Sequence, residues 1–166
     1  MKNKSMTRRI LNPFAMLCFG LAIGVVARLL YIFTTNLGEI FSQMAVWILM
    51  GTLISIYSRK AKQAMVNVSA FCLGMLLTYY VVAALSQGVY SMEFIIGWTV
   101  FALCSPVMAY FAWLTKERGL FPKIVRVGII AVSILSSILL FDGLRIYDFL
   151  IDSILIYFLF FKKINR

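Results

Sequence analysis

Three charged side chains stand inside apolar stretches of this chain and are its strongest candidates for chemistry. Arg28 interrupts the first apolar run, and Asp148 and Asp152 interrupt the last one. Since four residues make about one helical turn, the two aspartates would share one face of a helix. A charged side chain is costly in hydrocarbon, so it usually pairs with another charge or lines a polar cavity. These three residues are therefore candidate binding residues.

Two interpretations of these charges stay open. In the first, Arg28 pairs with one of the two aspartates inside a helical bundle and has only a structural role. In the second, Arg28, Asp148 and Asp152 line an outward-facing polar cavity together with Glu93 and Asp142. Such a cavity would bind a cationic or amphipathic solute, or pass protons, because acidic residues outnumber basic ones on that side.

The composition indicates what must position these residues. Of the 166 residues, 63% are hydrophobic and 13% are charged, whereas a soluble domain is about half apolar and about a quarter charged. A membrane-spanning helix needs about 20 apolar residues. The chain is therefore predicted to be all-α, a polytopic transmembrane bundle forming one integral membrane domain over residues 1–166. The apolar runs place six spans at approximately 13–33, 37–57, 64–85, 93–114, 124–141 and 144–161.

The last two spans are the least certain part of this count. They are short, and Asp142–Gly143 carries turn chemistry between them. The segment is expected to form either a tight hairpin or one bent element.

The placement of basic residues predicts the orientation. With six spans, 14 of the 16 basic residues fall on one side of the membrane, where Glu117 is the single acid. Basic residues concentrate in cytoplasmic connections. Both termini are therefore predicted to be cytoplasmic, in a multi-pass protein that is surrounded by membrane lipids.

Small and polar residues predict where helices touch. Gly20 and Gly24 form a Gly-x-x-x-Gly pair, a spacing that lets two helices approach closely. The contact would lie within the bundle or with another membrane subunit. Ser133, Ser136 and Ser137 give a small polar face to the fifth span, where they would bond their own helix or a neighbour.

Several functions are disfavoured by what the chain lacks. It has no histidine, and its three cysteines lie apart in apolar runs without metal-ligand spacing. No metal or other cofactor is expected, and a Ser/His or Cys/His nucleophile is excluded. An intramembrane aspartyl protease would need a Gly-x-Gly-Asp motif, which is missing, so the protein is predicted not to be an enzyme. The net charge of +10 is explained by membrane orientation and not by nucleic acid.

The segment Phe19–Leu29, with sequence FGLAIGVVARL, resembles the start of a family of small uncharacterised bacterial membrane proteins. That resemblance implies a location in the bacterial plasma membrane, and it implies no activity. In size, span count and orientation the chain also resembles the S-components of energy-coupling-factor transporters, whose six helices bind a small molecule from outside. Their first helix contacts a membrane coupling subunit through small residues, and Gly20 and Gly24 occupy a comparable position here, although the usual Ala-x-x-x-Ala is absent. The resemblance implies a membrane partner or an ABC-type ATPase module.

Two functional hypotheses follow. The first is a non-enzymatic solute-binding or transport subunit with a polar site near the outer face, formed by Arg28, Asp148, Asp152 and Glu93. The alternative is a small structural or interaction subunit of a larger membrane complex, whose intramembrane charges are internal ion pairs. A polar cavity that reaches the aspartates would favour the first hypothesis.

Overall fold

A computed structural model describes residues 11–34, 40–41, 43–86, 92–140 and 143–164. Over these residues the chain folds into six α-helices and a short π-helix, with no strand, so the predicted all-α fold is confirmed. The elements are α2 (Pro13–Phe33), α4 (Met44–Tyr57), α5 (Ala61–Leu85), α6 (Met92–Leu114), α7 (Leu120–Leu140), α8 (Ile146–Ile156) and η1 (Tyr157–Phe161).

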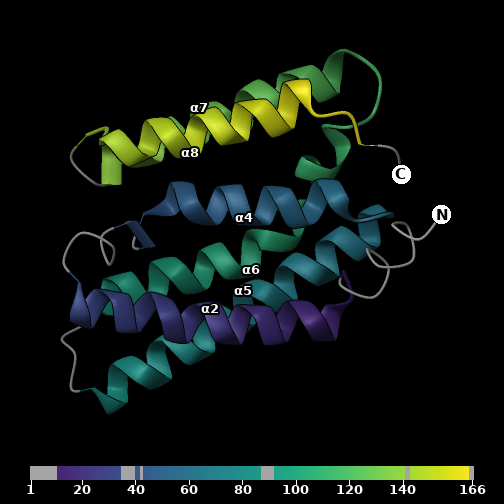
Figure 1. Ribbon diagram of the computed structural model, residues 1–166. Coiled ribbons are helices and arrows are strands. Elements are labelled where there is room, and N and C mark those ends of the chain that lie inside the picture. The colour runs from purple at the N-terminus through teal and green to yellow at the C-terminus, as the bar shows by residue number, and fades with distance from the viewer. Residues whose placement is uncertain (1–10, 35–39, 42, 87–91, 141–142, 165–166) are drawn as a thin grey trace.

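The helices run roughly alongside one another, and α4 lies in the middle (Figure 1). The pair α7 and α8 lies on one side of α4, while α2, α5 and α6 lie on the other. We call the end at which α2 begins and η1 ends the terminal end. The opposite end, at which α2 ends and α8 begins, is the far end. The basic residues that follow α4, α6 and η1 lie at the terminal end.

Four of the helices are long and apolar enough to cross a bilayer, which makes this a multi-pass membrane protein. They are α2, α5, α6 and α7. By contrast, α4 has 14 residues and would be about 21 Å long, against about 30 Å for the hydrocarbon core. Asn67 Nδ2 donates a hydrogen bond of 3.3 Å to Ser58 Oγ and holds the end of α4 close to the start of α5. Because α5 is much longer than α4, α4 does not extend as far toward the far end of the bundle as α5 does.

The most extensive contact between described helices joins α2 to α5, and glycines lie within it. A Cβ atom on Gly20 would collide with the carbonyl oxygen of Phe71, and one on Gly24 would collide with the carbonyl oxygen of Met75. Backbones therefore meet without intervening side chains, as small-residue spacing allows. Gly20 and Gly24 thus contact another helix of the same chain.

The α5 side of this contact has a matching small residue and a hydrogen bond. A Cβ on Gly74 would lie 2.6 Å from the carbonyl oxygen of Leu17. Thr78 Oγ1 donates a hydrogen bond of 2.8 Å to the carbonyl oxygen of Leu21. Interhelical hydrogen bonds of this kind add to packing where hydrophobicity alone gives no preference between neighbours.

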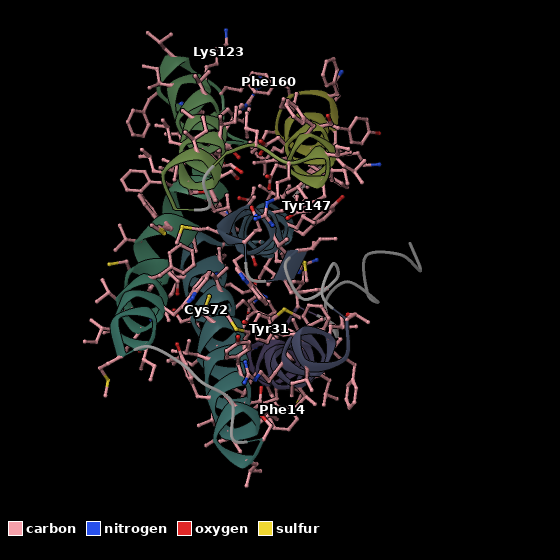
Figure 2. The ribbon with its side chains drawn as sticks, turned by 90° about the vertical axis from the view of Figure 1, so that its left-hand side faces the viewer. Phe14, Tyr31, Cys72, Lys123, Tyr147 and Phe160 are labelled. Carbon is pink, nitrogen blue, oxygen red and sulfur yellow. The ribbon has the colours of Figure 1, made fainter. Side chains whose placement is uncertain are left out.

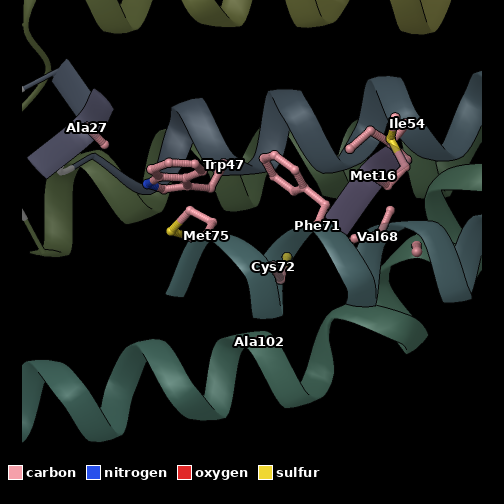
Figure 3. Close-up of a cluster of buried hydrophobic side chains, with 10 residues drawn as sticks. Met16, Ala27, Trp47, Ile54, Val68, Phe71, Cys72, Met75 and Ala102 are labelled. Atoms are coloured by element: carbon pink, nitrogen blue, oxygen red, sulfur yellow. The ribbon is translucent and has the colours of Figure 1, made fainter. Parts of the chain in front are cut away.

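A cluster of large apolar side chains fills the space between α2, α4, α5 and α6 (Figure 3). Trp47 of α4 packs against Phe71 of α5, with ring centroids 6.3 Å apart. Met16, Met75 and Val68 surround this pair. The cluster holds α4 in the middle of the bundle, where it separates the two groups of helices.

The largest differences from the predicted spans are at two helix starts. The second span is predicted from about residue 37, but α4 begins at Met44 because Gln43 takes an extended backbone conformation, with φ −79° and ψ 139°. Residues 35–39 and 42 lie outside the described residues. The fifth span is predicted from residue 124, but α7 begins at Leu120. Pro122 does not prevent this earlier start, since proline is tolerated in the first helical turn.

The end of the chain forms a hairpin of two helices and not one bent element. Helices α7 and α8 pack side by side (Figure 1). Gly143 has φ +132°, a conformation that favours glycine. Its amide donates a hydrogen bond of 3.3 Å to the carbonyl oxygen of Ser137. At the terminal end, Lys116 Nζ donates to the carbonyl oxygens of Leu159 and Lys162 and ties η1 to the α6–α7 connection.

Pro106 lies inside α6 without leaving a buried carbonyl unpaired. A proline has no N–H, so it cannot bond the carbonyl four residues earlier, which is that of Ala102. Ser105 Oγ donates to this carbonyl at 2.7 Å and replaces the missing amide. In hydrocarbon an unpaired carbonyl costs several kcal/mol, so the serine compensates for the proline.

The glycine contact predicts a position-dependent effect of one added methyl group. We expect Gly24→Ala to lower stability by about 1–3 kcal/mol, because the Cβ must displace the α5 backbone. Gly97→Ala is the matched control, since a Cβ there meets no atom within 4 Å. Thermal unfolding of both purified variants in detergent measures the difference. Equal melting temperatures for the two variants would contradict the close α2–α5 contact.

The pairing of Ser105 with Pro106 predicts a non-additive double mutant. Ser105→Ala alone is expected to cost about 1–3 kcal/mol, because the Ala102 carbonyl loses its donor and is left unpaired. In a Pro106→Ala background the restored backbone N–H takes that place, so the same serine change should cost much less. A double-mutant cycle of thermal stability measures this coupling. Additive losses would show that the hydroxyl does not replace the amide.

Candidate functional site

The described part of the chain has an acidic cluster between α8, α7 and α4. Asp148 and Asp152 lie one turn apart on α8 and are 0% and 7% exposed. They belong to the helix that packs against both α4 and α7. The predicted shared face of the two aspartates is therefore present, and it points into the protein and not toward lipid.

Asp152 is bound to α7 through a serine hydroxyl. Ser133 Oγ donates a hydrogen bond of 2.6 Å to Asp152 Oδ1, and both side chains are buried. The two helices are antiparallel, so one turn later on α7 corresponds to one turn earlier on α8. The buried Ser137 is thereby level with Asp148.

Asp148 has one oxygen in a helix cap and one without a partner. It stands at the third position of α8, where Oδ2 accepts the backbone N–H of Arg145 at 2.9 Å. A carboxylate in this position is favoured by the partial positive charge of a helix start. The other oxygen, Oδ1, is buried and has no hydrogen-bond partner among the described residues.

The start of α4 adds a second unpaired oxygen to this region. Gln43 is 1% exposed, and its Nε2 donates at 3.3 Å to the hydroxyl of Tyr147. Arg145 Nη1 also donates to that hydroxyl, at 2.7 Å. Tyr147 lies between α8 and α4 (Figure 2). In the described structure, Gln43 Oε1 is buried without a donor.

Arg28 is not part of this cluster, which corrects the predicted pairing with the aspartates. It lies in α2, where its guanidinium carbon is 5.1 Å from the ring centre of Tyr31 and 5.6 Å from that of Tyr79. Helix α4 separates α2 from α8 (Figures 1 and 2). The sequence places these charges at similar depth, but the glycine contact directs α2 toward α5 and away from α8.

The remaining predicted residues lie partly outside the described structure. The backbone of Glu93 is in the first turn of α6, which packs against α5, α4 and α7. The side chain of Glu93, and all of Asp142, fall outside the described residues. Among the predicted binding residues whose side chains the structure describes, Asp148 and Asp152 lie together and Arg28 lies apart from them.

Gln43, Ser133 and Tyr147 complete the cluster and were not predicted as site residues. One sequence signal could have indicated the serine. The buried positions Ser133 and Ser137 have the same four-residue spacing as Asp148 and Asp152. When two antiparallel helices carry this spacing, each serine can lie beside one aspartate. Only the packing shows that α7 and α8 are neighbours.

Two described clefts lie elsewhere in the bundle. One, of about 330 Å³, is walled by α4, α5, α6 and α7. Its lining is apolar apart from Thr52, Cys72 and Ser105. The other is a shallow apolar hollow beside α5 and α6. Neither is lined by Asp148 or Asp152, so neither is the predicted polar cavity.

Comparison with known proteins supports the expected uncharacterised family. A family of unknown function (DUF6518) matches residues 3–154, which is nearly the whole chain. No curated protein and no solved structure matches the chain. The predicted resemblance to the S-components of energy-coupling-factor transporters is thus not shown by these comparisons. The chain belongs to the DUF6518 family.

Proposed function

We propose that this protein is a transport-type membrane subunit that binds a small cation, in the simplest case a proton, at Asp148 and Asp152. One observation carries the proposal. The two carboxyl groups are buried one turn apart, and within the described residues neither forms an ion pair with a lysine or arginine. Buried carboxylates without a basic partner need a proton or another cation to balance their charge.

The atoms around the aspartates suit a small, hard cation. Asp148 Oδ1 and Gln43 Oε1 are buried acceptors without donors in the described structure. The hydroxyls of Ser133 and Tyr147 add further oxygens to the same region. Oxygen ligands favour hard cations. The compact packing supports a proton or a metal cation such as Na⁺ over a larger organic solute.

A structural or interaction subunit is the second candidate, and the helix cap favours it. Asp148 stabilises the start of α8, and Asp152 ties α8 to α7. Both hydrogen bonds would stabilise the fold in the absence of any ligand. This candidate was expected to have Arg28 paired with Asp148 or Asp152, but the described contacts of Arg28 are with Tyr31 and Tyr79. A coupling subunit or an ABC-type ATPase module as partner stays a proposal under either candidate.

The cation proposal predicts that Asp152→Asn separates ligand response from stability. In the wild-type protein, lower pH or added Na⁺ should raise the melting temperature, because a ligand that binds the folded state stabilises it. Asp152→Asn should remove that response. Its melting temperature without ligand should stay equal or rise, since asparagine keeps an acceptor for Ser133 and removes a buried charge.

Glu117→Gln is the control, because this acid lies at the opposite end of the bundle, in the connection after α6. It should retain the response to pH and Na⁺. The structural candidate predicts a different result, in which the wild-type protein shows no cation response and Asp152→Asn is less stable. Radioactive Na⁺ binding and the infrared carboxyl band distinguish a metal cation from a proton.

The proposed site faces outward only if both termini are cytoplasmic. We expect a fluorescent-protein fusion after Arg166 to fluoresce in a bacterial host, because that reporter folds in the cytoplasm. An alkaline phosphatase fusion after Ser86 should be active, because that enzyme needs the oxidising exterior. The predicted orientation follows from the basic residues at the terminal end. The reverse pattern of reporter activity would place the aspartates on the cytoplasmic side.

A further inference from the structure

Arg28 is a buried, charged side chain that has no counter-ion among the residues that the structure describes. It is 4% exposed, and no carboxylate pairs with it in the part of the chain that the structure describes. Its Nε is buried and has no hydrogen-bond acceptor. A guanidinium has five N–H donors and stays protonated in proteins. The described residues therefore leave both its charge and its donors without an anionic partner.

Two tyrosines position the guanidinium without neutralising it. Tyr31 lies on α2 and Tyr79 on α5, with their ring centres 5.1 and 5.6 Å from the guanidinium carbon. Aromatic faces attract a cation and orient it. They carry no negative charge, so an anion is still required for full compensation.

The adjacent helix contact holds Arg28 in place. Gly24, one turn before Arg28, meets the backbone of Met75 and the hydroxyl of Thr78. Thr78 is next in sequence to Tyr79 and is itself bonded to the α2 backbone. Because both helices are fixed here, the guanidinium and its two rings form a site that exists before a ligand binds.

The depth of Arg28 indicates where an anion would come from. Arg28 lies five residues before Phe33, the last residue of α2, so it is about 7–8 Å from the helix end. Tyr31 is half exposed, as expected for a tyrosine at the membrane interface. Lipid phosphates lie in the same interfacial region.

We propose that Arg28, Tyr31 and Tyr79 form a binding site for a phosphate-type oxyanion at the far end of α2 and α5. Planar guanidinium groups bind phosphate oxygens through two parallel hydrogen bonds. One of these would use Arg28 Nε, which has no acceptor among the described residues. The anion is either the phosphate of a lipid headgroup or a soluble phosphate. This site lies across α4 from the aspartates and does not depend on the proposed cation site.

The test uses the full-length protein purified in neutral detergent. Two probes are added separately, phosphatidylglycerol and inorganic phosphate, and binding is followed by native mass spectrometry and by thermal shift. We expect at least one probe to bind and to raise the melting temperature of the wild-type protein. Arg28→Gln should weaken that binding by about tenfold or more. Arg28→Lys keeps the charge and should bind with intermediate affinity, which shows that a folded variant was measured.

Arg126→Gln is the matched control variant. Arg126 also lies over an aromatic ring, that of Phe160, but its Nε already donates to the carbonyl of Thr115 at 2.7 Å. It should keep the wild-type affinity for the probe that binds at Arg28. Binding of phosphatidylglycerol alone identifies a lipid headgroup as the anion. Competition by inorganic phosphate identifies a soluble oxyanion.

Any of three results overturns the proposal. The first is that the wild-type protein binds neither probe, and the second is that Arg28→Gln binds the probe with unchanged affinity. The third is that the probes have no effect while Arg28→Gln and either Glu39→Gln or Glu93→Gln lower the melting temperature by the same amount. That third result would show that the counter-ion of Arg28 belongs to the chain itself.

Discussion

The glycine-mediated approach of α2 to α5 is the contact on which the rest of this bundle depends. Gly20 and Gly24 leave no room for a Cβ, because carbonyl oxygens of α5 occupy that space. In lipid, apolar surface gives little preference among neighbours, so close packing and interhelical hydrogen bonds choose them. The bond from Thr78 to the Leu21 carbonyl adds to this choice. Helix α2 packs on α5, and the other helices are arranged around α4. Trp47 of α4 packs on the ring of Phe71 of α5.

This arrangement keeps the buried charges of opposite sign apart. Arg28 lies on one side of α4 with two tyrosines, and Asp148 and Asp152 lie on the other side with hydroxyl and amide groups. If they were adjacent they would neutralise one another and have only a structural role. Because they are separated, each needs its own source of opposite charge. The physical basis of both proposed sites is therefore the same, namely a buried charge without a partner in the described chain.

Many buried polar groups of this bundle form hydrogen bonds within the protein, as is required where lipid offers none. Ser105 bonds the carbonyl that Pro106 cannot serve, and Lys116 bonds carbonyls at the end of the last helix. Within the described part of the chain, four buried side-chain atoms have no hydrogen-bond partner: Arg28 Nε, Gln43 Oε1, Asn67 Oδ1 and Asp148 Oδ1. Three of the four belong to the two proposed sites.

The sequence by itself determined the membrane class, the six helices and the shared face of Asp148 and Asp152. These features follow from apolar run length and helical period, which are local properties. It also indicated the glycine pair, because Gly20 and Gly24 carry a recognisable spacing. Only the tertiary structure decided which helices are neighbours. Arg28 therefore lies beside Tyr31 and Tyr79 and not beside an aspartate, although their predicted depths agree. Likewise, only packing placed Ser133 against Asp152, since helix pairing in lipid depends on surface fit that apolar patterning does not encode.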